Sequence, residues 1–332
     1  MIGTLLLKLE SIGCRAAVVP YSRRAEAIRE VVSRHEQGEL NEAFYQEYLA
    51  PRVTEPDLET SNPRSLIVVA LPDRPVRIHL TLDGAPFAAL ASPGYQRRPH
   101  QRLLSVVREI LEPAGFTVAR VDGPAKTIAT MIGLARYGRS NLSYISGLGS
   151  FYPLALLASD LACDASRPRA PELLPRCQGC RACLAACPTG AIARDRFLLH
   201  AEWCLSFWNE KPARVPFPAW IKPEWHNAIG GCLLCQQACP ENHPFLDEIV
   251  EGPAFDEETT RLFLAGTKKE DFSEDLQTVL EEWWLTTLLD VLPRNLGVLA
   301  EKERTARANA NAATPGTGLE PRSSTAQSLS FP

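Results

Sequence analysis

The chain has 332 residues, 45% of them hydrophobic, and a formal net charge of −4. A chain of this length can bury a large core, and length predicts roughly two domains. The negative balance gives no general attraction to nucleic acid, so RNA binding would need a local basic patch. Three leucines at 5–7 are followed by Lys8 and Glu10, which predicts neither a signal peptide nor a membrane-spanning helix.

The first 121 residues predict helices mixed with short strands. Residues 1–60 read as helices around one strand at 16–19, and apolar positions at helical spacing predict a helix at 101–112. The run SLIVVAL is nearly all apolar and β-branched, as in a central strand, and VRIHLTL alternates apolar and polar residues. The predicted strands are 16–19, 65–71, 76–82 and 116–121.

Two segments of this part could bind a ligand. The first, at 92–102, concentrates Arg97, Arg98, His100 and Arg102, which suit an anion or a solvated helix start. The second, at 133–152, is rich in glycine, serine and aromatic residues, which suits either a ligand loop or an irregular packed loop. Its candidate binding residues are Arg139, Asn141, Ser143, Tyr144, Gly149 and Ser150.

Eight of the ten cysteines follow a proline-rich linker at 165–176. The first four have the spacing C-x2-C-x2-C-x3-C-P, by which a backbone wraps one four-iron cluster and sends its last thiolate to a second cluster. The second group repeats this pattern with one cysteine missing, and a lone Cys204 can supply it. The eight predicted ligands are Cys177, Cys180, Cys183, Cys187, Cys204, Cys232, Cys235 and Cys239.

The crossing rule divides these thiolates into two sets of four, because the cysteine before each proline belongs to the other cluster. The first set is Cys177, Cys180, Cys183 and Cys239, and the second set is Cys187, Cys204, Cys232 and Cys235. Paired zinc sites are a weaker alternative, since they need neither the third closely spaced cysteine nor the Cys-Pro endings. A disulfide framework suits small secreted domains, so we expect reduced thiols and a cytoplasmic location.

The carboxyl-terminal part predicts helices and then a tail. Residues 273–302 offer two amphipathic helices broken at Pro293. Residues 303–332 are rich in Ala, Asn, Thr, Ser, Pro and Gly without apolar periodicity, which predicts disorder.

The order CQGCRACLAACPTGAI, a lone cysteine, then GCLLCQQACPEN resembles the epoxyqueuosine reductases and their iron–sulfur relatives. SLIVVAL, GLARYGRSN and GSF match that family in order, so the resemblance covers roughly residues 1–300. It implies two 4Fe-4S clusters that pass electrons from an external ferredoxin or flavodoxin to a cobalamin near 133–152. The cobalamin would then remove the epoxide oxygen of a modified tRNA base.

Three departures bear on what the resemblance implies. The family's catalytic aspartate stands ahead of a Pro-x-x-Glu-Arg segment, whereas here Asp122 precedes Pro124 without a Glu-Arg pair. The usual Gly-Lys of the next motif is Gly138-Arg139, and the loop after the first strand is shorter. The family's carboxyl-terminal helical repeats are reduced to one hairpin, so we expect weak tRNA binding and a substrate that can differ.

The sequence therefore predicts an α+β protein. We expect a nitroreductase-like or dehalogenase-like domain at 1–165, a ferredoxin-like 2[4Fe-4S] domain at 166–250, a short helical extension at 251–302 and a disordered tail at 303–332. Asp122 is the candidate proton donor, and no membrane partner is expected. The competing interpretation is an electron-transfer protein without cobalamin.

Overall fold

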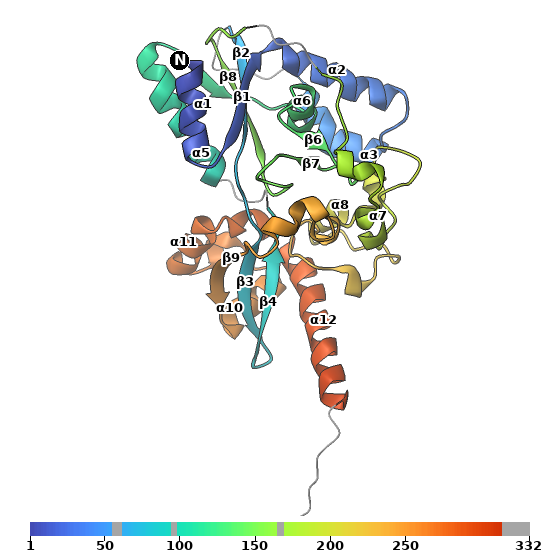
Figure 1. Cartoon of the computed structure of the whole chain (residues 1–332). Coiled ribbons are helices and arrows are strands. Elements are labelled where there is room, and N and C mark those ends of the chain that lie inside the picture. Colours follow the sequence, from blue (N-terminus) through green and yellow to red (C-terminus); the bar gives the residue numbers. More distant parts are fainter. Residues whose placement is uncertain (55–61, 94–97, 165–168, 314–332) are drawn as a thin grey trace, which may run out of the picture.

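A computed structural model describes residues 1–54, 62–93, 98–164 and 169–313, and Figure 1 shows its arrangement. One sheet with helices on both faces forms the amino-terminal half. A second, smaller sheet and the carboxyl-terminal helices form the other half, and short helices with long connections lie beside both.

The first sheet has the strand order β1 (Arg15–Pro20), β2 (Ser65–Ala70), β8 (Leu154–Ser159) and β5 (Val118–Arg120). Every neighbouring pair in it is antiparallel. All six residues of β2 are buried, which explains why this strand reads as a continuous apolar run instead of an alternation.

Helices cover both faces of this sheet. Helices α1 (Ile2–Ser11) and α5 (Arg98–Leu111) pack on one face, where Ile67 and Val69 of β2 point. Helices α2 (Ser22–Glu36) and α6 (Ala125–Met131) pack on the other face, where Leu66 and Val68 point. Successive strand residues face opposite sides, so β2 supplies both cores.

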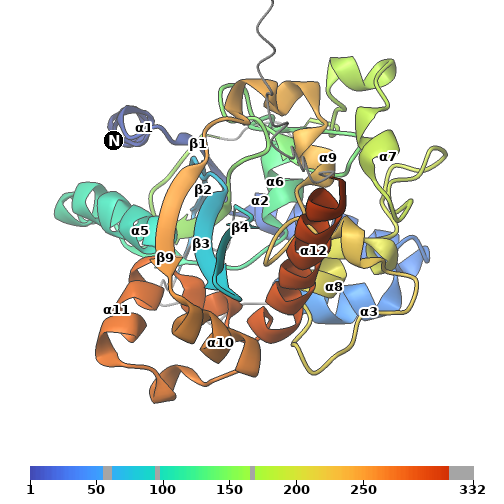
Figure 2. The same cartoon turned by 90° about the horizontal axis from the view of Figure 1, so that it is seen from below.

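The second sheet joins segments that are far apart in the chain. Strand β3 (Val76–Leu82) pairs antiparallel with β4 (Ala85–Ala91) and parallel with β9 (Val250–Phe255). Helices α10 (Glu257–Ala265), α11 (Glu274–Glu282) and α12 (Leu292–Ala313) pack on one side of it, as the view from below shows (Figure 2). One core unites Val76, Ile78 and Leu80 with residues of all three helices and of β9.

The remaining elements are short and hold the cysteine-rich region and the cavities described below. The helices are α3 (Glu42–Phe44), α4 (Ala50–Val53), α7 (Ala182–Ala186), α8 (Leu205–Asn209), α9 (Leu234–Gln237) and a π-helix (Tyr45–Leu49). The 3-10 helices are Glu112–Ala114, Pro175–Gln178, Ala201–Trp203, Pro223–Trp225, Pro240–Phe245, Lys269–Asp271 and Leu285–Leu288. A small hairpin joins β6 (Arg136–Tyr137) and β7 (Ser143–Tyr144).

The mixed α+β character is confirmed, as are the four predicted strands, with ends shifted by up to two residues. Strands β4, β8 and β9 were not predicted. The contiguous domain division stays a prediction, but residues 76–91 pack mostly with β9 and the carboxyl-terminal helices, while Leu90 also packs near Phe151. A correction concerns the tail, because residues 303–313 continue α12.

Pro293 lies in the first turn of α12, where proline's missing N–H costs nothing, so it does not break a helix there. The rest of the predicted disordered tail, 314–332, lies outside the described residues. Among the helices of the described ranges, none has the length and apolar character needed to cross a membrane.

Candidate functional site

The thiols of the first predicted set influence one another electrostatically. Burial raises the pKa of Cys183 to about 11, and the neighbouring thiols Cys177, Cys239 and Cys180 add to the shift. Burial also raises the pKa of Cys177, with further contributions from Cys239 and Cys180. Cys239 is 56 or more positions from the other three in the chain, so the fold brings it near thiols that are remote in the sequence.

The thiols of the second set behave in the same way. Burial raises the pKa of Cys204 to about 11, and Cys232 and Cys187 contribute. Burial likewise raises the pKa of Cys235, with smaller electrostatic contributions from Cys232, Cys204, Cys187 and Cys183. The four residues share the wall of one cavity. These four thiols therefore line one space, and the partition of the eight thiols into two sets of four stays a prediction.

Local structure places hydrogen-bond donors around two thiols of the second set. Cys204 is the N-cap of α8, and the backbone N–H groups of Ser206 and Phe207 lower the pKa of its thiol. Asn227 Nδ2 donates a hydrogen bond to Cys232 Sγ at 3.3 Å. Burial raises the pKa values of most of these thiols, so binding a cluster must release their protons. The N–H groups near Cys204 and Cys232 would then stabilise the negative charge of the bound thiolates.

Arg139 and Tyr144, predicted to bind cobalamin, instead lie against the first set. Arg139 Nη2 donates to the backbone oxygen of Cys177 at 2.9 Å, and its positive charge lowers the pKa of that thiol. Its Nε is buried and has no partner among the described residues, a donor that an anionic cluster would satisfy. Burial raises the pKa of Tyr144, and a hydrogen bond to Cys239 contributes.

Gly149 and Ser150 anchor the cysteine-rich region to the first sheet. Ser150 N–H donates to Asn242 Oδ1 at 2.9 Å, and its Oγ accepts from Asn242 Nδ2 at 2.8 Å and Gln236 Nε2 at 3.0 Å. Gly149 has φ +61°, and a Cβ there would collide with Asn242 and Phe245. Ser143 accepts from Tyr152 Oη at 2.9 Å. These contacts show that the glycine-rich segment mainly docks the two parts of the chain.

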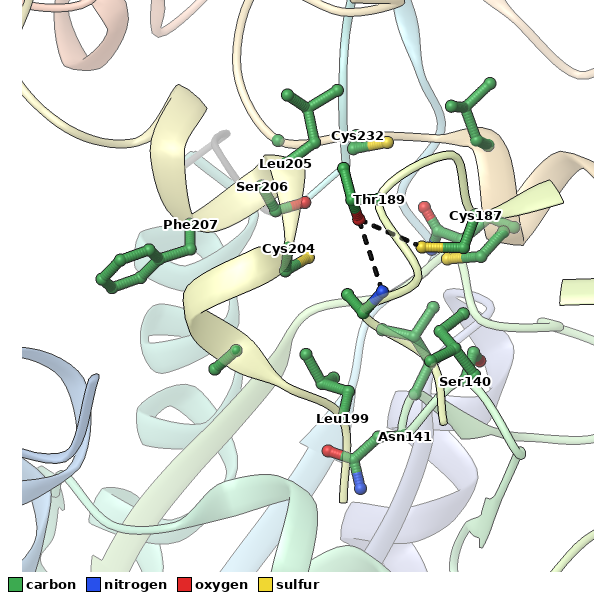
Figure 3. Close-up of a pocket in the computed structure, with 18 of the residues that line it drawn as sticks. Ser140, Asn141, Cys187, Thr189, Leu199, Cys204, Leu205, Ser206, Phe207 and Cys232 are labelled. Atoms are coloured by element: carbon green, nitrogen blue, oxygen red, sulfur yellow. Dashed lines mark hydrogen bonds between the residues drawn. The ribbon is translucent and has the colours of Figure 1, made fainter. Parts of the chain in front are cut away.

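Two adjoining cavities lie on the second set's side. The cluster cavity encloses about 450 Å³ and includes Cys187, Cys204, Cys232 and Cys235 in its wall. The side cavity encloses about 470 Å³ between α2, the π-helix and the start of α6. Their shared wall consists of Leu40, Phe44, Tyr48, Lys126, Asn141 and Leu198. In Figure 3, the sulfur atoms of Cys187, Cys204 and Cys232 surround the space opposite Ser140 and Asn141.

Lys126 is the cation in the wall shared by the two cavities. Its Nζ donates to the backbone oxygen of Asn141 at 2.7 Å and to Asn141 Oδ1 at 3.2 Å. Burial lowers the pKa of Lys126 to about 8, and the neighbouring Cys204 acts in the opposite direction. Lys126 can therefore carry and release a proton near neutral pH between the cysteines and the side cavity.

Of the six residues predicted to bind cobalamin, Asn141 is therefore the one that lines these cavities. Its φ of +61° allows the backbone oxygen and the side chain to meet the same ammonium group. Asp122, the predicted proton donor, is exposed and lines neither cavity, although the next residue, Gly123, does. The backbone oxygen of Asp122 accepts from Arg24 Nε at 2.8 Å, which holds the chain there.

Sequence reasoning missed Lys126, because a lone lysine in VDGPAK carries no motif and its burial depends on the whole fold. The predicted basic patch is only partly described. Arg97 lies outside the described residues, and Arg98 and Arg102 lie within α5, where the side chains are not described. Arg136 forms an exposed ion pair with Glu172.

Residues 176–242 match the family model of the 4Fe-4S double cluster binding domain. This match shows that the cysteine-rich segment is similar to domains that bind two 4Fe-4S clusters. The resemblance to epoxyqueuosine reductases is also confirmed among curated proteins. The chain is 30% identical over 171 residues to the epoxyqueuosine reductase of Cyclobacterium marinum, covering 46% of this chain and 54% of the relative.

A second relative, the epoxyqueuosine reductase of Francisella cf. novicida, is 29% identical over 147 residues, covering 43% of this chain and 39% of the relative. These matches thus span about half or less of the relatives' length. Among solved structures, epoxyqueuosine reductase from Bacillus subtilis superposes with a TM-score of 0.65 at 18% identity, covering 93% of this chain and 83% of that one.

An epoxyqueuosine reductase structure with a tRNA-Tyr epoxyqueuosine-modified stem loop gives a TM-score of 0.53 at 19% identity, covering 90% of this chain and 84% of that one. At sequence identities this low, these superpositions show a shared fold and nothing more.

Proposed function

We propose that this protein is an oxidoreductase like epoxyqueuosine reductase. It relays electrons through two 4Fe-4S clusters to a ligand in the adjoining cavities. The observation that carries this proposal is the position of Cys187, Cys204, Cys232 and Cys235 in the wall of the cluster cavity. This cavity shares Lys126 and its neighbours with the side cavity. Electrons enter from an external ferredoxin or flavodoxin. A ligand in this space would lie next to the second cluster.

Cobalamin is the cofactor that we propose for this space. The two cavities share a wall and are mostly lined by apolar and aromatic side chains, as sites for large organic ligands are. Phe44, Tyr48, Lys126 and Asn141 would hold it. A bound corrinoid would supply a strongly reducing cobalt, so that the difficult chemistry belongs to the cofactor and the protein supplies position, charge and protons.

We propose that Lys126 provides a proton for the reaction. Reductive removal of an epoxide oxygen as water consumes two electrons and two protons and leaves a carbon–carbon double bond. The electrons come from the ferredoxin or flavodoxin through the clusters, and Lys126 can supply one proton because its pKa lies near 8. For Asp122 to play this role, the 120–124 segment would need to move and bring the Asp122 carboxylate into the side cavity.

The substrate that we propose is a modified tRNA base or a related small molecule. The tRNA stem loop bound in a solved relative supports the first choice. The net charge of −4 opposes extensive phosphate contact. Helices α10 to α12 pack against the second sheet, and no further helical repeat follows them up to residue 313. We therefore expect weak tRNA binding through few contacts.

An absorbance spectrum tests the cofactor assignment. Anaerobically reconstituted protein is incubated with cobalamin, separated from free cofactor and measured; we expect corrinoid bands in addition to the cluster absorption. Turnover is then assayed with an epoxyqueuosine-bearing stem loop and with the free nucleoside, using reduced flavodoxin. Clusters without bound corrinoid, together with rapid oxidation by an artificial acceptor, would instead establish the electron-transfer interpretation.

A further inference from the structure

The first turn of α12 carries two polar side chains that lie against the cysteine-rich region, Arg294 and Asn295. Asn295 is fully buried and Arg294 is partly buried. Among the described residues, neither side chain forms a hydrogen bond or an ion pair with a carboxylate. They instead bind backbone carbonyl groups of distant segments, so the start of the carboxyl-terminal helix acts on the backbone around the cysteines.

Arg294 fastens the chain that follows α8. Its Nη2 donates to the backbone oxygens of Trp208 at 2.7 Å and Lys211 at 2.9 Å. Its Nη1 donates to the backbone oxygen of Val215, and its guanidinium group lies 3.9 Å from the ring centroid of Phe217. One side chain thus contacts the segment 208–217 at several points, through charge-assisted hydrogen bonds and stacking.

Asn295 extends this network to the other cysteine segment. Its Nδ2 donates to the backbone oxygens of Asn209 at 2.8 Å and Ile229 at 2.6 Å, and its Oδ1 accepts from Arg294 Nε at 3.0 Å. Asn209 Nδ2 in turn donates to the backbone oxygen of Gly231 at 2.7 Å. These hydrogen bonds tie the two cysteine segments to the start of α12, although Asn209 Oδ1 is buried without a hydrogen-bond partner among the described residues.

The segments that this network holds carry ligands of the second set. Cys204 caps the start of α8, which ends at Asn209, and Gly231 directly precedes Cys232. In the described ranges, the hydrogen bonds of Arg294 and Asn295 reach neither 177–183 nor Cys239. The first set is instead held from the amino-terminal part, by Arg139 at Cys177 and by the Ser150–Asn242 contacts.

We propose that Arg294 and Asn295 are positioning residues for the second cluster, so that the carboxyl-terminal helix is part of that cluster's binding site. The inference rests on the assignment of two clusters but not on the substrate or on cobalamin. Groups that orient metal ligands typically change metal affinity by about 10- to 100-fold when removed. We expect a loss of that size at the second cluster and no change at the first.

The test uses proteins that can hold one cluster each. In Cys183→Ala, which keeps the second set intact, adding Arg294→Met should lower bound iron from about 4 per chain toward zero or speed its release to a chelator by about tenfold or more. In Cys204→Ala, which keeps the first set intact, the same substitution should leave about 4 irons and their release rate unchanged. Reduced-state EPR spectra of the full chain should show one signal diminished.

Arg304→Met is the matched control, because Arg304 lies on the same helix and pairs with Asp83 at the surface. It should leave both clusters unchanged. Arg294→Lys, which retains the charge, should partly restore the second cluster and provides the measurement if Arg294→Met does not fold. Equal losses of iron in the two backgrounds, or no loss in either, would overturn the proposal, since a general folding role would not distinguish the clusters.

Discussion

Removing cysteines in pairs tests which four thiolates hold each cluster. Cys183 and Cys187 are four positions apart in the chain, yet the crossing rule predicts that they belong to different sets. Cys187 and Cys204 are 17 positions apart and belong to the same set. Single substitutions alone cannot separate the crossed partition from a sequential one, because both predict the loss of one cluster.

The expected iron content follows from the number of complete thiol sets. The intact protein should hold about 8 irons per chain, and any single substitution of a ligand should leave about 4. Cys187→Ala with Cys204→Ala should still leave about 4, because both changes damage the second set. Cys183→Ala with Cys187→Ala should leave almost none, because each set then lacks one ligand.

Iron and acid-labile sulfide are measured per chain after anaerobic reconstitution, with visible absorption as an independent record of cluster content. Cys163→Ala is the control, since Cys163 lies outside both sets and should leave about 8 irons. Retention of about 4 irons in the Cys183/Cys187 double variant would refute the crossed partition. Stoichiometric zinc without iron would end the cluster assignment altogether.

Three further predictions concern the cavity, the docking contacts and the substrate. Lys126→Met and Lys126→Arg should each lower turnover by about 10²- to 10⁴-fold, as loss of a general acid does. The unaltered enzyme should lose activity as pH rises through about 8, because Lys126 deprotonates there, and an unchanged pH profile in the variants would remove Lys126 from the mechanism. Asn242→Ala should lower the free energy of unfolding by about 2–3 kcal/mol, measured by denaturant titration, because it leaves Ser150 and Gln236 with unpaired buried groups. A gel-shift series over a salt gradient should show weak tRNA binding; tight, salt-sensitive binding that Arg97→Ala and Arg98→Ala abolish would contradict that expectation.

The sequence alone predicted the cysteine-rich domain and its candidate ligands, because cluster binding requires thiolates at spacings that a short stretch of backbone can wrap around one iron–sulfur unit. It also predicted β2 and β3, because the burial of each strand is visible in its sequence pattern. Strand β2 is covered on both faces and is continuously apolar, whereas β3 is covered on one face and alternates apolar and polar residues.

The tertiary structure alone decided where the glycine-rich segment and the carboxyl-terminal helices act. Glycine, serine and tyrosine suit a ligand loop and a docking loop equally well, and the contacts of Ser150 with Asn242 depend on residues 92 positions away. The roles that we propose for Lys126 and Arg294 likewise cannot be read from the sequence, because the function of a lone cation depends on the groups around it. Burial and backbone partners, which only the complete fold brings together, determine whether such a residue carries a proton or holds a cluster in place.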